Sequence, residues 1–269
     1  MGRLRSLARV FSVALLLLWL AVDFLLRPVR TRRQGAERIH LCCRRILRAL
    51  GVSWNASGET PKSGAVVCNH LSYLDILVFA AHRPFIMVAK SEVSEWPLIG
   101  WLTRQAGTVF VVRGGGPTTY PAVNQAMAEA FRSGLPVLFF PEGTTTDGSS
   151  VLPFKRGLLH SVLNEAAPLH VSTLEYSNAA ACWWGDDLLL PHILQVASRN
   201  DLHAELHFGS AVLGREDRFE LAAAAREEII QLRERSTTQQ IALAHLHEDL
   251  LHGPVEGLGA FDGHGCVLR

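Results

Sequence analysis

The sequence predicts an α/β fold: a mixed, largely parallel sheet flanked by helices and preceded by two N-terminal helices. Two observations predict it. From about residue 61 onwards, short apolar runs typical of buried strands alternate with segments of helical spacing. Before that point, a long apolar run is followed directly by a basic amphipathic segment. With 269 residues and 48% hydrophobic content, the chain can form one domain of about 200 residues with an extension.

The first expected element is a helix at residues 10–26, an apolar run in which only Asp23 places a charge. Its 17 residues would form roughly 25 Å of helix, which is marginal for a hydrocarbon core of about 30 Å. Arginines flank the run on both sides, which suits a helix lying in one leaflet as well as one crossing the bilayer. No small-x-small cleavage site follows it, so we do not expect a cleaved signal peptide.

The second expected element is a basic amphipathic helix at residues 36–50, where arginines separate apolar residues at helical spacing. This segment could instead be a surface helix of the globular part. Because it directly follows the apolar run, we favour a membrane platform made of the two helices. The first 50 residues hold eleven Arg and no Lys against only two acidic residues, so we expect them to meet an anionic surface. The adjoining apolar run favours a membrane over nucleic acid as that surface.

The remaining elements belong to the globular part. Strands are expected at residues 64–68, 85–89, 107–113, 136–140, 169–174 and 203–208, and helices at residues 71–81, 118–133 and 218–235. Such alternation predicts parallel strands with functional groups at their ends. The expected organisation is membrane-anchoring helices in residues 1–58, an α/β domain in residues 59–236, and a C-terminal helix and flexible tail in residues 237–269.

Five cysteines show neither metal-ligand spacing nor an even disulfide framework, which favours a reducing, cytoplasmic setting. They are Cys42, Cys43, Cys68, Cys182 and Cys266. Together with the N-terminal helices, this predicts a protein of the inner or cytoplasmic membrane whose active site faces the cytoplasm.

The candidate chemistry starts at His70, which follows the predicted strand at residues 64–68, and at Asp75, five residues later. If the turn folds Asp75 back under the imidazole, its carboxylate accepts from one ring nitrogen and raises the basicity of the other. The free nitrogen can then take a proton from an attacking hydroxyl group. A purely structural histidine fits this spacing by itself, so the interpretation depends on further motifs.

Further motifs follow in order along the chain. They are Arg113 at the end of the predicted strand GTVFVVR, Glu142, Gly143 and Thr144 after the strand PVLFF, and Lys155 in the segment FKRG. With Asn-His and its downstream Asp, this ordered set resembles the glycerolipid acyltransferase family, specifically the 1-acylglycerol-3-phosphate O-acyltransferases. The resemblance covers residues 62–176 and the two N-terminal helices.

The resemblance implies roles for these residues. His70 is the general base, Asp75 its orienting partner, and Arg113 matches the residue thought to bind the acceptor's phosphate. Glu142, Gly143 and Thr144 match a block associated with acceptor binding, and from its chemistry we expect Glu142 to hold Arg113 or a substrate hydroxyl. The family usually has Arg and Ser next, whereas Thr145 and Thr146 stand here. Lys155 and Arg156 can supply the positive charge that this departure removes.

The implied reaction moves a fatty acyl group from acyl-CoA or acyl carrier protein to the hydroxyl of lysophosphatidic acid, forming phosphatidic acid. The thioester is already activated, so no Ser or Cys nucleophile is needed, and we expect no metal and no cofactor besides the acyl donor as co-substrate. Lysophosphatidic acid is the favoured acceptor, and lyso-ornithine lipid or another lysophospholipid is the alternative. The sequence leaves both donors open.

Other protein classes fit less well. A serine hydrolase lacks its Gly-x-Ser-x-Gly elbow, and the glycines at residues 114–116 lack the Lys or third Gly of a phosphate-binding loop. A metal site at His245, His247 and His252 lacks acidic or Cys partners. A non-catalytic membrane adaptor would keep the N-terminal helices but has no use for the pair formed by His70 and Asp75.

Overall fold

The computed structural model describes residues 2–112 and 119–252 of the chain. The chain divides into two units, Met1–Arg233 and Glu234–Arg269, and apart from the end of the last helix all the structure discussed below belongs to the first. The α/β class and the largely parallel sheet predicted from the sequence are confirmed. The N-terminal helices and the sheet belong to the same compact unit.

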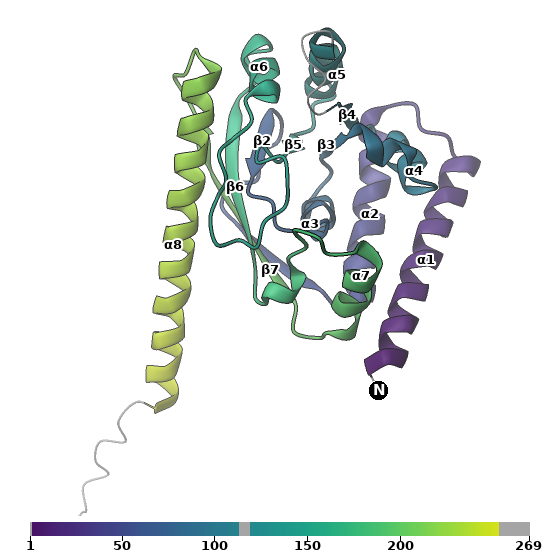
Figure 1. The fold of residues 1–269 in the computed structure, drawn as a ribbon, viewed down its shortest axis with the longest axis vertical. Helices are drawn as coiled ribbons and strands as arrows, with labels where there is room; N and C mark the ends of the chain where they lie inside the picture. The colour runs from purple at the N-terminus through teal and green to yellow at the C-terminus, as the bar shows by residue number, and fades with distance from the viewer. Residues whose placement is uncertain (1, 113–118, 253–269) are drawn as a thin grey trace, which may run out of the picture. The chain divides into compact units, whose positions relative to one another are not determined.

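The described residues form one seven-stranded sheet at the centre of this unit (Figure 1). Its strands are β1 (Ser53–Ser57), β2 (Ala65–Cys68), β3 (Ile86–Lys90), β4 (Val109–Val111), β5 (Val137–Phe139), β6 (Leu169–Tyr176) and β7 (His203–Val212). They lie in the order β1-β7-β6-β2-β5-β3-β4, and every neighbouring pair is parallel except β6 with β7. The central strands β2 and β5 are buried throughout, which explains their unbroken apolar sequences.

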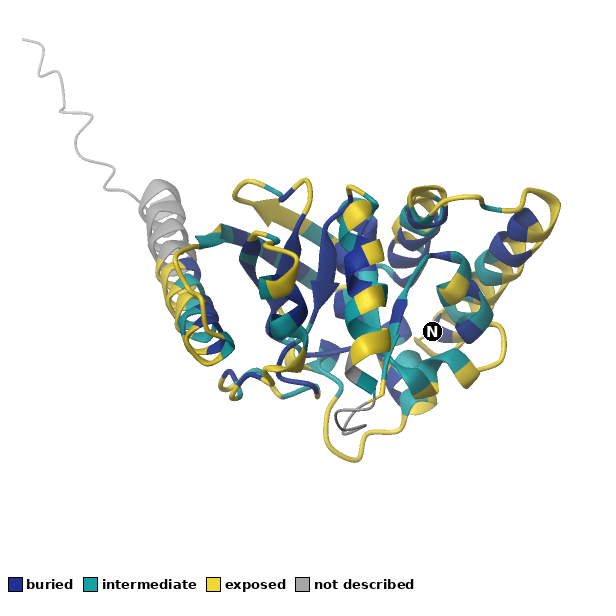
Figure 2. Ribbon diagram, turned by 90° about the horizontal axis from the view of Figure 1, so that it is seen from above, coloured by how far each residue is buried: buried dark blue, intermediate teal, exposed yellow. Residues whose placement is uncertain are grey.

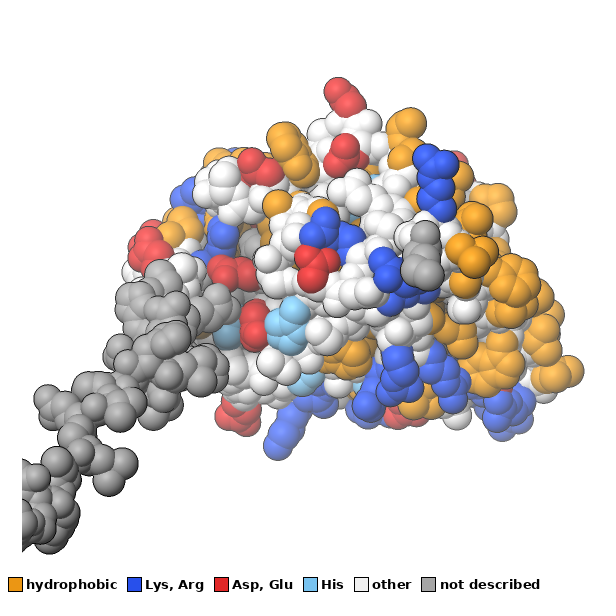
Figure 3. Space-filling view, turned by 90° about the horizontal axis from the view of Figure 1, so that it is seen from below, with side chains coloured by type: hydrophobic (Ala, Val, Ile, Leu, Met, Phe, Trp, Pro, Cys, Tyr) orange, Lys and Arg blue, Asp and Glu red, His pale blue; other side chains and the backbone are white. Residues whose placement is uncertain are grey.

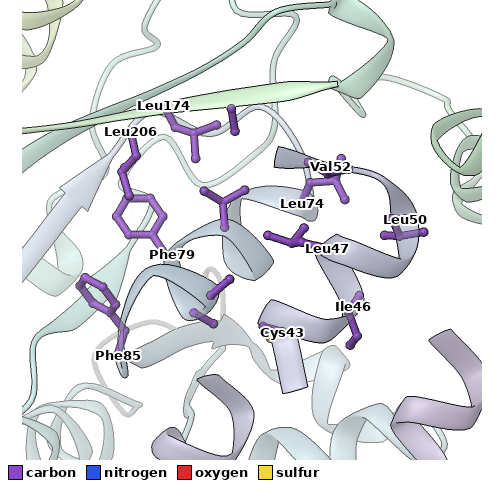
Figure 4. Close-up of a cluster of buried hydrophobic side chains, with 14 of the residues drawn as sticks. Cys43, Ile46, Leu47, Leu50, Val52, Leu74, Phe79, Phe85, Leu174 and Leu206 are labelled. Carbon is purple, nitrogen blue, oxygen red and sulfur yellow. The ribbon is translucent and has the colours of Figure 1, made fainter. Parts of the chain in front are cut away.

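Helices cover both faces of the sheet (Figure 2). One core cluster joins the sheet to α1 (Gly2–Leu26), α2 (Arg32–Leu50), α3 (Leu74–His82) and α7 (Leu189–Ser198). The other joins it to α5 (Tyr120–Arg132), α6 (Gly157–Asn164) and the first turns of α8 (Arg218–His252). Successive residues of β2 alternate between the two clusters, as the period of a strand requires. Figure 4 shows the first cluster, in which side chains of α2 and α3 meet those of β6 and β7.

The helix α1 is longer than the predicted run, and it is long and apolar enough to cross a membrane by length and composition. It nevertheless lies along the globular part. Leu20 and Phe24 are buried in the first core cluster, and Phe24 meets Trp101 edge to face with ring centroids 6.1 Å apart. At the other end of α1, the guanidinium groups of Arg5 and Arg9 donate to backbone carbonyls at the C-terminal end of α7.

Some elements differ from expectation. The helix predicted from residue 71 begins at Leu74, because residues 69–73 form a loop held by hydrogen bonds described below. The predicted strand at residues 107–113 appears as β4, and its predicted last residue, Arg113, lies outside the described residues. The helix predicted at residues 218–235 continues as α8 to His252, since that stretch has no Gly or Pro before Gly253.

Candidate active site

The candidate site lies at the carboxyl ends of β6, β2 and β5, which are adjacent and mutually parallel in the sheet. The loop that holds His70 follows β2, Glu142 lies just beyond β5, and Tyr176 is the last residue of β6. Parallel strands end at one edge of a sheet, so residues far apart in the sequence meet there.

Asn69 fixes the start of the loop after β2. This buried side chain donates from Nδ2 to the carbonyl oxygen of Leu174 and accepts at Oδ1 from the Leu174 amide, both at 2.9 Å. The double contact ties the end of β2 to β6. The chain then turns, and α3 begins at Leu74, which places Asp75 in the first helical turn.

The structure brings His70 and Asp75 together. His70 Nδ1 lies 2.7 Å from Asp75 Oδ2, and the same oxygen accepts from the backbone amides of Leu71 at 2.7 Å and Ser72 at 3.0 Å. The Asp75 side chain has no exposed area, whereas that of His70 is 13% exposed. The carboxylate is thus held by the loop that carries the imidazole, and with Nδ1–H donating to it, Nε2 is left as the basic nitrogen.

Tyr176 supplies the fourth donor to this carboxylate, and sequence reasoning missed it. Its hydroxyl donates to Asp75 Oδ1 at 2.7 Å. Burial, together with the nearby Asp75 charge, raises the pKa of Tyr176 well above its usual value, so the phenol stays protonated and donates. No local motif marks this residue, because the contact joins positions 101 residues apart.

Glu142 is buried and positions the backbone of the same loop. Its Oε1 accepts from the amide of His70 at 2.8 Å, and its Oε2 accepts from the amide of Leu152 at 2.8 Å. Burial raises the pKa of this carboxyl group, although both backbone amides act in the opposite direction. Within the described residues, each oxygen of Glu142 accepts from one backbone amide. Arg113 lies outside the described residues, so the expectation that Glu142 holds Arg113 or a substrate hydroxyl stays a prediction.

The carbonyl and the ring of His70 are held as well. Thr146 donates from its backbone amide to the His70 carbonyl at 2.9 Å. The imidazole stacks on Phe140, with ring centroids 3.9 Å apart and an interplanar angle of 10°. The amide, the carbonyl and the ring of His70 therefore each have a fixed partner, and within the described residues Nε2 has none.

The other predicted site residues surround this centre unevenly. Gly143 has φ +73°, and a Cβ there would lie 2.6 Å from Lys155 Nζ, so the glycine lets the Lys155 side chain pass against the backbone. Lys155 is tied to the same loop by its backbone amide, which donates to Pro141 at 2.8 Å. Thr144 is exposed. Arg113 lies outside the described residues, so its predicted phosphate role stays a prediction.

This arrangement can support base catalysis on a hydroxyl group. An imidazole paired with a buried carboxylate, and fixed at its backbone and ring, is pre-organised to accept a proton at Nε2. Within residues 2–112 and 119–252, no group of three or more His, Cys, Asp or Glu is arranged to hold a metal ion. The side chains of His245, His247 and His252 lie outside the described ones.

Comparisons with known proteins identify similar acyltransferases. A family model described as Acyltransferase matches residues 56–174, which span β2 and most of β6. The chain is 36% identical over 246 residues to the lyso-ornithine lipid O-acyltransferase of Pseudomonas aeruginosa, covering 85% of this chain and 93% of that protein. It is 37% identical over 118 residues to the 1-acyl-sn-glycerol-3-phosphate acyltransferase of Neisseria gonorrhoeae, covering 44% and 46% of the two chains.

A solved structure shares the fold. It is the crystal structure of the 1-acyl-sn-glycerophosphate acyltransferase PlsC from Thermotoga maritima, with a TM-score of 0.55 and 19% sequence identity. The alignment covers 87% of this chain and 98% of that one. At this identity the likeness concerns the fold alone.

Proposed function

Because this chain belongs to the glycerolipid acyltransferase family, we propose that it transfers a fatty acyl group from acyl-CoA or acyl carrier protein to the free hydroxyl of a lysolipid. The observation that carries the proposal is the contact of 2.7 Å between His70 Nδ1 and the buried Asp75. It leaves Nε2 as the nitrogen that can meet an acceptor hydroxyl.

The chemical step follows from this pair. Nε2 removes the hydroxyl proton as the oxygen attacks the thioester carbon, and a tetrahedral oxyanion forms. The C–S bond then breaks, the new ester remains, and the imidazolium returns its proton to the departing thiolate. Asp75 stabilises the transient positive charge of the imidazolium and keeps the ring in one orientation.

For the acceptor we propose lyso-ornithine lipid as the first candidate. Relatives bearing that name match most of this chain: the Pseudomonas aeruginosa protein at 36% identity and the Rhodobacter capsulatus protein at 35% over 215 residues. Thr145 and Thr146 also stand where a cation and Ser usually follow Glu-Gly-Thr. An ornithine headgroup carries a carboxylate and an amine but no phosphate, so one fewer positive charge suits it.

Lysophosphatidic acid is the second candidate. The relative from Neisseria gonorrhoeae, named for that class of acceptor, matches the segment that contains the site at 37% identity. Lys155 beside Gly143 offers a cation to a phosphate. We further propose that the protein works at the cytoplasmic face of the membrane, where α1 meets the lipid.

The test uses the purified full-length chain with acyl-CoA or acyl carrier protein and a panel of both lysolipids. Release of the carrier thiol together with a diacyl product in the mass spectrum is the expected result, with lyso-ornithine lipid giving the higher kcat/KM. Thiol release without a diacyl product would indicate a thioesterase and overturn the proposal.

Two variants separate the roles of the residues. His70→Ala should abolish transfer while circular dichroism stays unchanged, and His160→Ala on α6 serves as the matched control. Arg113→Ala should raise KM for the acceptor more than KM for the donor, because a guanidinium fork suits the carboxylate or phosphate of the acceptor. Equal effects on the two KM values would argue against that role.

A further inference from the structure

A groove runs between the two N-terminal helices, outside the candidate active site. It has a volume of about 530 Å³ and is lined by Ser12, Leu15, Leu16 and Trp19 of α1 and by Arg45, Arg48 and Ala49 of α2. The α1 side of the groove is almost entirely apolar. The α2 side presents two guanidinium groups, and that of Arg45 lies 4.8 Å from the centroid of the Trp19 ring.

The two arginines of this groove have no acidic partner in the part of the chain that the structure describes. Within the described residues, neither Arg45 nor Arg48 forms an ion pair, and both side chains are exposed. Asp23 is paired with Arg27 and Arg38. The other acidic residue of the first 50, Glu37, lies eight positions before Arg45 on α2, which is about 12 Å along the helix. The groove thus combines an apolar wall with uncompensated positive charge.

The groove opens beside an apolar surface. On α1 the side chains of Phe11, Leu15, Leu18 and Trp19 are between 46% and 64% exposed. In Figure 3, apolar side chains gather at the right, where α1 lies in Figure 1, and basic side chains border them. Arg5 and Arg9 donate to carbonyls at the end of α7, which holds α1 against the globular part. The exposed apolar side chains of α1 therefore lie on the face of the helix that points away from the globular part.

We propose that this groove binds one anionic phospholipid of the membrane, with an acyl chain against Leu15, Leu16 and Trp19 and the headgroup phosphate on Arg45 and Arg48. The chemistry of the two walls carries the proposal, because a guanidinium fork pairs with phosphate and apolar side chains exclude water from an acyl chain. The groove is an anchoring site rather than the acceptor site. The inference rests on the proposed function only in placing the protein at a lipid surface.

Native mass spectrometry of the full-length chain in detergent tests the site directly. Dioleoylphosphatidylglycerol should give a species with one retained lipid per chain, and neutral dioleoylphosphatidylcholine should not. The double variant Arg45→Gln, Arg48→Gln should lose that species. In vesicle flotation, the same variant should bind phosphatidylglycerol-containing vesicles about twenty-five-fold more weakly, because each of the two arginines contributes about a fivefold factor.

The matched control is the double variant Arg44→Gln, Arg132→Gln, which removes the same net charge. Arg44 is an exposed residue of α2, and neither Arg44 nor Arg132 lines the groove. The control should keep the lipid-bound species and lose less than about fivefold in vesicle binding. Equal losses in both double variants would mean that only the diffuse charge of the helices matters, and would overturn the site. Both measurements omit the acyl donor and can be repeated with His70→Ala. Lipid binding is therefore tested independently of catalysis, and a failure of the proposed function can be told from a failure of the lipid site.

Discussion

At Asp75, four donors meet two carboxylate oxygens. The His70 ring and two backbone amides share Oδ2, while the Tyr176 hydroxyl alone serves Oδ1. A carboxylate with this many donors has one orientation. The orientation of the His70 imidazole therefore depends in part on a tyrosine that donates to its carboxylate partner.

Tyr176→Phe tests this dependence. Removing the hydroxyl takes away one of the four donors that hold the carboxylate, so the imidazole is oriented less firmly for proton transfer. We expect kcat to fall by up to about tenfold while the KM values for donor and acceptor stay unchanged, as initial rates will measure. An unchanged kcat together with a lower melting temperature would show that Tyr176 serves the fold only.

Glu142→Gln tests the carboxylate that holds the loop. Glutamine has one acceptor oxygen and one amide donor, so either His70 or Leu152 loses the partner of its backbone amide. We expect a loss of about 1–3 kcal/mol in unfolding free energy, and a fall in kcat, measured by denaturant titration and initial rates. Glu165→Gln, at the exposed end of α6, is the control and should change neither quantity.

At this scale the sequence predicts local contacts and misses distant ones. The spacing from His70 to Asp75 is short enough for a turn to join them, and the two side chains do meet, while their catalytic role stays a prediction. The contacts of Tyr176 and Glu142 could not be predicted, because no local sequence pattern predicts the strand order that brings these residues to the loop of His70.

At the scale of elements, α2 and α4 (Ile99–Gln105) approach each other closely at Gly35. A Cβ on Gly35 would lie 2.0 Å from the carbonyl oxygen of Gln105, which is backbone and cannot move aside. Gly35→Ala should therefore destabilise the protein by about 1–3 kcal/mol, although alanine normally favours a helix. Gly157→Ala in α6 is the control, since no atom lies within 4 Å of its Cβ position. Thermal unfolding of both variants measures the difference, and an unchanged melting temperature for Gly35→Ala would contradict the close approach.

The strong apolar patterns predicted their elements, and the weak ones did not. The strands β2, β5, β6 and β7 appear near their predicted positions because each is buried on at least one face. The strand β3 also appears near its predicted position, although only Ile86 of its five residues is buried. The edge strand β1 was not expected, since its sequence SWNAS has no β-branched residue and four of its five side chains are exposed. The helices α4, α6 and α7 have ten residues or fewer, too few turns for a clear period.

At the scale of the whole molecule, α1 is part of the core and also carries the exposed apolar surface that we propose meets lipid. Phe24→Ala should lower the free energy of unfolding by about 3–5 kcal/mol, because a buried ring that contacts Trp101 is lost. Phe11→Ala is the control on the same helix, since Phe11 is 64% exposed and its loss should leave stability unchanged. Equal melting temperatures for the two variants in detergent would instead indicate that α1 does not pack against the globular part.

The hydrogen bonds at the ends of β6, β2 and β5 affect how the protein loses activity on heating. The base and its carboxylate partner follow β2, the carboxylate that holds their loop follows β5, and the tyrosine that donates to the partner ends β6. These three strands are adjacent, so displacing one of them disturbs the groups that the other two hold. Local unfolding of this edge would abolish catalytic turnover before the rest of the chain unfolds. Loss of activity on heating should therefore report local unfolding of this edge at a lower temperature than global unfolding.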